Sequence, residues 1–398
     1  MLRPDSLALT LLLALLAGVG PLTVDMYLAS LPEIGRVLAA PTAQVQLTIS
    51  VYLVGHALGQ VFYGPLSDRH GRRPVLIFAL CIYLAAALVC LFATSIEMLI
   101  AARFVQALGG SGATVLARTV VRDMYDGVRV GRELSRMAAI MAIAPLVAPL
   151  IGGVLQTAFG WRSNFVVLVL FGATALSMVW LLLPETLRQR APEAVSLGSM
   201  LRSFRRFLGH RSYVIHLGIA TCCMGGLFSW ISTASFVLQD IYGLSPLIFG
   251  VAFAVGGSGY LAGTSLGARF VSRWGSARTM GFGTIAMAAG GIAMLPVLAV
   301  GWHAAIGLVL CIGLYMAGMG LAWPQAQAGA LMPFPDRAGA ASSLLGVTTQ
   351  TSAAIAGAVL GHLLGDSAWP LAIAMAIAGA LSLLLQTLVQ PSDAAKAA

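Results

Sequence analysis

The dominant feature of the sequence is a series of apolar stretches, each about twenty residues long, that fills nearly the whole chain. A helix needs about 20 mostly apolar residues to cross the hydrocarbon core of a bilayer. We therefore expect helices near residues 7–31, 44–65, 75–95, 98–121, 134–157 and 163–183, and again near 213–238, 247–269, 279–300, 304–331, 340–363 and 369–389. The sequence predicts an all-α integral membrane protein with about twelve transmembrane helices.

Composition supports lipid as the main solvent. Of the 398 residues, 59% are hydrophobic and only 9% are charged, whereas soluble domains carry roughly 25% charged residues. The net charge of +9 comes from arginines between the apolar stretches, so we expect no nucleic-acid binding. The cysteines and histidines show no metal-ligand spacing and no phosphate-binding loop is present. We therefore expect no metal, no cofactor and no enzymatic activity.

The longest polar segment divides the apolar stretches into two sets of six. It spans Pro184 to Ser212 and contains six arginines. We predict an N-terminal six-helix half (1–183), a cytoplasmic linker (184–212) and a C-terminal six-helix half (213–398), related by pseudo-symmetry. Repeated halves of this kind are a common plan of transporters.

The distribution of basic residues predicts the orientation in the membrane. With the N-terminus inside, only Arg36 and Arg162 face outward, while Arg103 and Arg118 lie within the fourth apolar stretch. Nearly all other basic residues then lie in cytoplasmic loops and tails, as the positive-inside rule requires. We expect a multi-pass protein of the bacterial inner membrane with both termini in the cytoplasm.

Two charged residues lie at depth in predicted spans. Asp25 is in the outer half of the first span, and an ionised group there costs roughly 2.5–3.5 kcal/mol on insertion scales, so it usually faces a cavity. We interpret it as a reversible proton site; the alternative is a carboxylate at a helix end near the outer headgroups. Arg103 lies at similar depth and needs a carboxylate, backbone carbonyls or water as partner. If both share a cavity, protonation of Asp25 would release Arg103; the alternative is an arginine that snorkels outward.

Several uncharged polar residues also lie in predicted spans. Gln60 and Gln106 are candidates for lining a substrate cavity, although each could equally form an interhelical hydrogen bond. His56 is a weaker candidate as a proton carrier, because a histidine in a packed bundle is more often hydrogen-bonded to the backbone.

The segment Gly64-Pro65-Leu66-Ser67-Asp68-Arg69-His70-Gly71-Arg72-Arg73-Pro74 resembles the signature cytoplasmic loop of the major facilitator superfamily. We expect a gate in which Gly64 and Gly71 permit tight turns and Asp68 lies at a facing helix N-terminus. Arg69 or Arg72 would reach an acid such as Asp123. The alternative is an arginine cluster that only sets the topology. A second copy, 267–275, has Ser272 in place of Asp68, so the gate should depend on the first copy.

Two further segments resemble motifs of this superfamily. The segment around Arg103 resembles its fourth-helix motif, whose arginine is implicated in proton coupling. The segment 144–153 resembles the fifth-helix motif of antiporters, with Ala148 in place of a usual glycine. The resemblance implies that Pro145, Pro149, Gly152 and Gly153 bend this helix and let it pack tightly against the other half.

The segment Asp25-Met26-Tyr27-Leu28-Ala29-Ser30-Leu31-Pro32 resembles the first-helix signature of the bicyclomycin and chloramphenicol resistance group, with Ala29 in place of a usual proline. The resemblance implies a proton-coupled exporter of small drug-like molecules, functional as a monomer, with Asp25, Tyr27 and Arg103 in the cavity. Uptake of a metabolite, export of an amino acid and a non-transporting receptor or assembly factor stay open as alternatives.

Overall fold

A computed structural model describes residues 7–125, 128–187, 204–300, 304–334 and 337–389, which form helices and short connections without any strand. The chain divides into two compact units, Met1–Val195 and Ser196–Ala398. The predicted linker 184–212 is only partly covered, because residues 188–203 lie outside the described residues.

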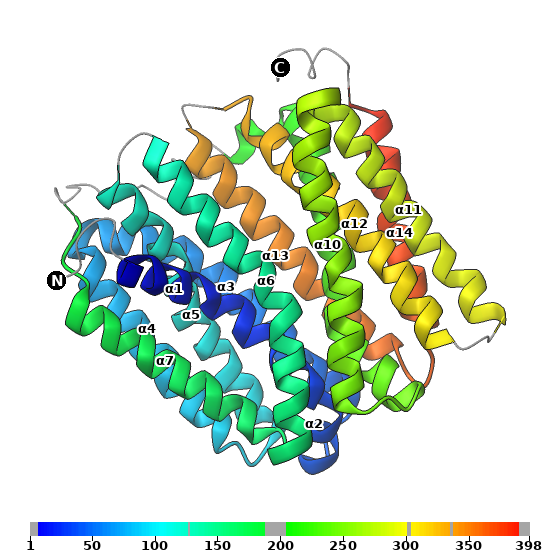
Figure 1. The fold of residues 1–398 in the computed structure, drawn as a ribbon, viewed down its shortest axis with the longest axis horizontal. Helices are drawn as coiled ribbons and strands as arrows, with labels where there is room; N and C mark the ends of the chain where they lie inside the picture. The colour runs from blue at the N-terminus through cyan, green and yellow to red at the C-terminus, as the bar shows by residue number, and fades with distance from the viewer. Residues whose placement is uncertain (1–6, 126–127, 188–203, 301–303, 335–336, 390–398) are drawn as a thin grey trace. The chain divides into compact units, whose positions relative to one another are not determined.

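Unit 1 contains the helices of the first apolar set (Figure 1). Their bounds are α1 (Leu7–Asp25), η1 (Leu28–Ser30), α2 (Leu31–Val37), α3 (Thr42–His70), α4 (Arg72–Leu91), α5 (Ile96–Met124), α6 (Val128–Phe159) and α7 (Arg162–Leu182).

Unit 2 contains the helices of the second set, preceded by a short helical segment at 204–208. Their bounds are α9 (Arg211–Ser235), η2 (Phe236–Ile241), α10 (Pro246–Trp274), α11 (Ser276–Val300), α12 (Ala304–Leu331), α13 (Ala338–Leu363) and α14 (Trp369–Thr387). Within the described residues, 11 helical segments are long and apolar enough to cross a membrane, and α6 adds the shorter apolar stretch Ile143–Phe159. The predicted all-α membrane architecture is confirmed.

The two units repeat one packing plan. In unit 1, α5 packs against α1, α3 and α4, while α4 also contacts α7 and α1 also contacts α6. In unit 2, α12 packs in the same way against α9, α10 and α11, while α11 also contacts α14 and α9 also contacts α13. The successive helices of the two units therefore occupy corresponding places.

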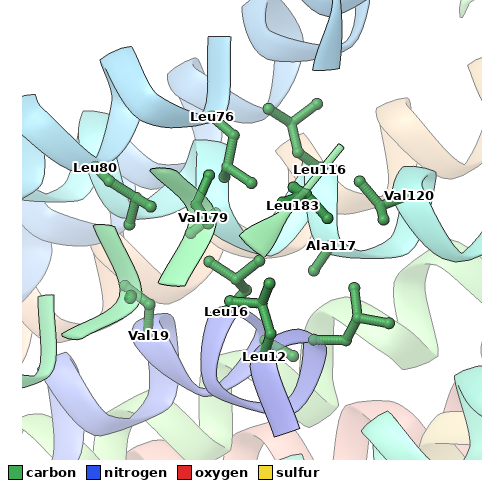
Figure 2. Packing of buried hydrophobic residues seen from close by; sticks show 14 of the residues in the cluster. Leu12, Leu16, Val19, Leu76, Leu80, Leu116, Ala117, Val120, Val179 and Leu183 are labelled. Carbon is green, nitrogen blue, oxygen red and sulfur yellow. The ribbon is translucent and has the colours of Figure 1, made fainter. Parts of the chain in front are cut away.

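The core of unit 1 lies between α1, α4, α5 and α7 (Figure 2). Apolar side chains from all four helices interdigitate there, including Leu12, Leu16, Val19, Leu76, Leu80, Leu116, Ala117, Val120 and Val179, with Leu183 just after α7. In lipid, such packing depends on close backbone approach, which small residues permit. Gly109 of α5 is one example, since a Cβ there would collide with the α4 backbone at Ala79 and Tyr83.

The first predicted span differs from the expected single helix over 7–31. The α1 helix ends at Asp25, and the chain continues through a turn at Met26 and Tyr27, the 3₁₀ segment η1 and the short helix α2. Pro32 lies in the first turn of α2, and a proline has no N–H for a continuous helical ladder. This break after Asp25 positions the first candidate site.

Candidate functional site

Arg103 lies inside unit 1 with 0% of its side chain exposed. Its Nη1 donates to Gln106 Oε1 at 2.7 Å, and its Nη2 donates to the backbone carbonyl of Thr23 at 3.1 Å. The guanidinium carbon is 4.3 Å from the ring centroid of Tyr27 and 4.4 Å from that of Tyr52. Two aromatic faces therefore stabilise the cation, while two oxygens bind its N–H groups.

Hydroxyl groups fix the surroundings of these rings. Tyr27 Oη is 2.9 Å from Thr48 Oγ1. Thr23 Oγ1 donates to the Val19 carbonyl at 2.5 Å and lies 2.8 Å from Tyr83 Oη. These contacts join α1, α3 and α4 around the Arg103 guanidinium, which α5 supplies.

Asp25 is buried, with 4% exposure, at the C-terminal end of α1. The carboxyl group of Asp25 forms no ion pair with the described residues. The structure thus places Asp25 two residues from Thr23, whose carbonyl binds Arg103, without pairing the acid with the arginine. Of the partners that the sequence allowed for Arg103, the backbone carbonyl is the one observed.

Further buried polar atoms of unit 1 have no protein partner. Among them are both amide atoms of Gln46, the hydroxyl of Ser50, Nε of Arg103 and Nε2 of Gln106. A buried polar group without a partner costs about 1–3 kcal/mol, so these groups favour the entry of water or a polar ligand.

The structure brings together four of the five predicted cavity residues: Asp25, Tyr27, Arg103 and Gln106 surround the break in the first span. Gln60 lies apart, with its Nε2 3.1 Å from Nδ1 of His56. The prediction missed Tyr52 and the Thr23 carbonyl. Tyr52 could have been predicted, because it is an aromatic residue at about the depth of Arg103. The availability of the Thr23 carbonyl could not, because it depends on the helix break, which the sequence pattern does not show.

Arg72, at the first position of α4, is the centre of the predicted gate. Its Nη1 contacts Asp68 Oδ1 at 2.5 Å and Ser67 Oγ at 2.6 Å, and its Nε contacts Asp123 Oδ2 at 2.9 Å. Arg69 is exposed and forms no hydrogen bond or ion pair with the described residues. The side chain of Arg72 therefore joins the ends of α3, α4 and α5; this end of unit 1 is called the arginine-rich end below.

Glu185, which the sequence analysis did not single out, occupies the N-terminus of α4. Its carboxylate accepts the backbone N–H of Arg72 at 2.8 Å and of Arg73 at 3.2 Å. We expected Asp68 at such a helix N-terminus, whereas the structure shows Asp68 on the Arg72 side chain. Glu185 could have been predicted as a partner of α4, because it is an acid directly after the sixth apolar stretch, on the same side of the membrane as Gly71.

The two glycines of this motif differ in their surroundings. Gly71 ends α3 with φ +101°, and a Cβ there would also collide with the Glu185 carboxylate. Gly64, expected in a tight turn, lies instead in the middle of α3, and an added Cβ would meet nothing within 4 Å. Only Gly71 is a turn residue, because α3 continues beyond Pro65 to His70.

The predicted antiporter motif lies within α6, which continues through Pro145 and Pro149. A Cβ on Gly152 would collide with the carbonyl of Met26, so this glycine lets α6 contact the break after Asp25 directly. Gly153 is buried, and its carbonyl accepts from Thr157 Oγ1 at 2.8 Å. The resemblance implied close packing against the other half, whereas the neighbour of Gly152 lies in the same unit.

Polar side chains of α6 and α7 also hold the segment after the break. Ser30 donates to Gln156 of α6, and Asn164 Nδ2 of α7 donates to Ser30 Oγ at 2.9 Å. Gln156 in turn donates to the carboxylate of Glu33. Hydrogen bonds therefore hold the part of the first span after Asp25 against α6 and α7.

The corresponding end of unit 2 uses neutral groups. The α10 helix ends at Gly275 with φ +79°, as α3 ends at Gly71. Ser276 of α11 donates to Gln325 Oε1 of α12 at 2.8 Å, and Ser272 donates to its own helix at the Arg269 carbonyl. A hydrogen bond between uncharged groups thus replaces the ion pairs that Arg72 forms in unit 1.

Residues 13–358 match the family model described as the Major Facilitator Superfamily. Together with the twelve-helix plan and the Arg72 cluster, this match shows that the chain belongs to the major facilitator superfamily of membrane transporters.

Individual transporters of this superfamily are similar to the chain over most of its length. The chain is 35% identical to the uncharacterized MFS-type transporter YdgK of Bacillus subtilis, over 86% of each chain. It is 30% identical to the bicyclomycin resistance protein homolog of Haemophilus influenzae, over 88% of each. It is also 30% identical to multidrug resistance protein D of Escherichia coli, over 87% of this chain and 86% of the relative.

Solved structures share the fold. The xylose transporter XylE of E. coli, in a partially occluded inward open conformation, aligns with a TM-score of 0.73 over 96% of each chain at 15% identity. A bacterial homolog of the human lysosomal transporter Spinster aligns with a TM-score of 0.67 at 19% identity, over 98% of this chain and 95% of that one.

Proposed function

We propose that the protein is a proton-coupled antiporter that exports small drug-like molecules by alternating access. It would act as a monomer in the bacterial inner membrane, with both termini in the cytoplasm. Relatives named for bicyclomycin and multidrug resistance, similar over more than four fifths of the chain, support this substrate class.

The observation that carries the proposal is the burial of Arg103 against the carbonyl of Thr23, a residue two positions before Asp25 in α1. A guanidinium keeps its charge at any relevant pH, so Arg103 is a fixed cation bound to the end of α1 that carries Asp25. No cation among the described residues is bound to Asp25, and an ionisable group at depth in a membrane span usually has a function there.

The proposed coupling uses the two acceptors available to Arg103. While Asp25 is protonated, Arg103 binds the Thr23 carbonyl and Gln106, as observed. Loss of the proton creates a carboxylate close by that competes for the guanidinium, and the turn after Asp25 then rearranges. Substrate and proton would occupy the site alternately, so that an inward flow of protons drives the substrate outward.

The larger movement would involve the two predicted halves, 1–183 and 213–398, rocking about the substrate site and joined by the linker 184–212. The arginine-rich end would serve as the cytoplasmic gate. Arg72, Asp68 and Asp123 would hold α3, α4 and α5 together through each cycle, with Glu185 fixing the start of α4.

The test is drug-dependent proton movement in inverted membrane vesicles energised by respiration. Chloramphenicol, bicyclomycin, sulfonamides and cationic dyes are added in turn while a pH-sensitive probe reports the acidic lumen. We expect dequenching by at least one class with the wild-type protein, no response with Asp25→Asn, and a wild-type response with the exposed control Asp366→Asn.

Retained proton release in Asp25→Asn would contradict the assigned role of Asp25. Accumulation of the compounds by intact cells, driven by the proton gradient, would contradict export and favour uptake on the same fold.

A further inference from the structure

The short helical segment at 204–208, just before α9, has two distinct sides. Its sequence is Phe204-Arg205-Arg206-Phe207-Leu208. Residues three apart lie on the same side of a helix, so the two phenylalanines share one side, and Arg205 and Leu208 share another. Phe207 is buried with 0% exposure, and Phe204 packs against the same apolar cluster of unit 2. The two arginines and Leu208 are exposed, and the proposed transport cycle does not use them.

Aromatic contacts fix this segment to the end of unit 2. The ring centroid of Phe207 lies 4.6 Å from that of Phe334, which follows α12, and 5.6 Å from that of Tyr213 in α9. Tyr213 Oη in turn donates to the carbonyl of Ala341 in α13 at 2.8 Å. The segment is therefore held at the ends of α9, α12 and α13, and its exposed side chains keep a defined direction.

The exposed side is basic and partly apolar. Arg205, Arg206 and Arg211 are exposed, and their side chains form no hydrogen bond or ion pair with the described residues. His210 between them is also exposed. Leu208 exposes 54% of its surface beside these cations. Basic side chains next to an exposed apolar one are typical of a segment that lies in the headgroup region of a bilayer.

The length of the following span places the segment at this depth. The membrane-crossing stretch Arg211–Ile241 has 31 residues, which at 1.5 Å per residue is on the order of 45 Å long. The hydrocarbon core of a bilayer is only about 30 Å thick. The ends of this stretch therefore extend into the headgroup layers, and the segment at 204–208 lies directly before its first residue.

We propose that Arg205, Arg206, Leu208 and Arg211, called the Arg205 surface below, bind the headgroup of an anionic phospholipid. Guanidinium groups bind phosphate oxygens through pairs of parallel hydrogen bonds, and Leu208 contacts the upper part of the acyl chains. Clusters of basic residues next to a membrane span attract anionic lipids in this way. The inference concerns the lipid surroundings of unit 2 and does not depend on the proposed transport function.

The test measures lipid binding by native mass spectrometry, which resolves each lipid bound to the purified full-length protein in detergent micelles. The protein is titrated with phosphatidylglycerol and with phosphatidylcholine that has the same acyl chains. Each basic residue near an anionic surface raises the affinity by about fivefold. Wild-type protein should therefore bind its first phosphatidylglycerol at least about tenfold more tightly than phosphatidylcholine, and this preference should decrease as the salt concentration is raised.

Substitutions separate the contributions of charge and apolar contact. Arg205→Gln combined with Arg206→Gln should lower the affinity for phosphatidylglycerol at least about fivefold and leave that for phosphatidylcholine unchanged. Leu208→Ser should weaken both lipids by a similar factor, because their acyl chains are the same. The matched control, Arg273→Gln combined with Arg278→Gln, neutralises two exposed arginines where α10 and α11 meet and should keep the full preference.

Three results would overturn the proposal. Unchanged phosphatidylglycerol affinity in the variant that lacks Arg205 and Arg206 would show that water alone covers these arginines. An equal loss in the control would show a response to net charge rather than to this surface. Displacement of the lipid by an equal concentration of glycerol 3-phosphate would instead indicate a site for soluble phosphates.

Discussion

Arg103 shows how a cation can be buried in a membrane protein without a bound carboxylate. The planar guanidinium fits between two aromatic rings and still directs N–H groups to the Thr23 carbonyl and the Gln106 amide. A lysine ammonium carries the same charge but is not planar and lacks this fork of donors. The shape of the group is therefore as important as its charge.

We expect Arg103→Lys to lower drug-dependent proton movement at least about tenfold while the protein still folds, because two directed hydrogen bonds are each worth about 1.5–3 kcal/mol. The measurement is initial dequenching rate in inverted vesicles at matched expression. Arg269→Lys, an exposed change of the same kind, is the control. Wild-type rates in Arg103→Lys would show that charge alone is sufficient.

Gly152 tests the contact between α6 and the break in the first span. We expect Gly152→Ala to lower the thermal stability of the detergent-solubilised protein, because the new methyl group collides with the Met26 carbonyl and such overpacking costs about 1–3 kcal/mol. Gly225→Ala in α9 is the control, since a Cβ there meets nothing within 4 Å. Equal melting temperatures for both variants would contradict the close contact.

At the scale of the helix, the start of α4 depends on an acid that is distant in sequence. We expect Glu185→Gln to destabilise the protein by about 0.5–2 kcal/mol, the usual range for loss of an N-terminal cap. Thermal unfolding is again the measurement. Glu97→Gln is the matched control, because Glu97 is an exposed acid in the first turn of α5. A loss in Glu97→Gln as large as that in Glu185→Gln would show that only the helix dipole is involved.

The helix scale also shows what the sequence could predict. The apolar stretches predicted the places of the 11 described helical segments that can cross a membrane and of the shorter apolar stretch in α6, since length and hydropathy are sufficient for that purpose. The break after Asp25 was not predicted, because residues 26–31 contain no charge and no proline, and α6 and α7 hold this segment by contacts distant in sequence. Glu185 was missed for the same reason: its partners, the Arg72 and Arg73 amides, are more than a hundred residues away.

In the whole molecule, the two units share a packing plan but differ in how their corresponding ends are joined. Unit 1 uses the ion pairs of the buried Arg72 side chain with the partly exposed Asp68 and Asp123, and unit 2 uses the Ser276–Gln325 hydrogen bond. The sequence predicted that the two ends would differ, because Ser272 stands in place of Asp68 in the second copy of the motif. It did not predict that Ser276 and Gln325 would form the replacement contact.

We expect Asp123→Ala to destabilise the protein more than Gln325→Ala does. A hydrogen bond to a charged group contributes about 1.5–3 kcal/mol, whereas a neutral hydrogen bond contributes about 0.5–1.5 kcal/mol. In Asp123→Ala, Asp68 stays bound to Arg72, which should reduce the loss of stability. Melting temperatures of the two variants and of Arg72→Ala provide the check, and equal losses for Asp123→Ala and Gln325→Ala would contradict the asymmetry.

The hydrogen bond from Arg103 to the main chain at Thr23 also bears on genetics. A backbone acceptor is present whatever residue occupies position 23, so no codon change there removes it. In a selection for second-site suppressors of weakened Arg103 variants, position 23 should therefore yield none that act through this acceptor. Revertants should instead map to Gln106 and to Tyr27 and Tyr52, whose side chains surround the guanidinium.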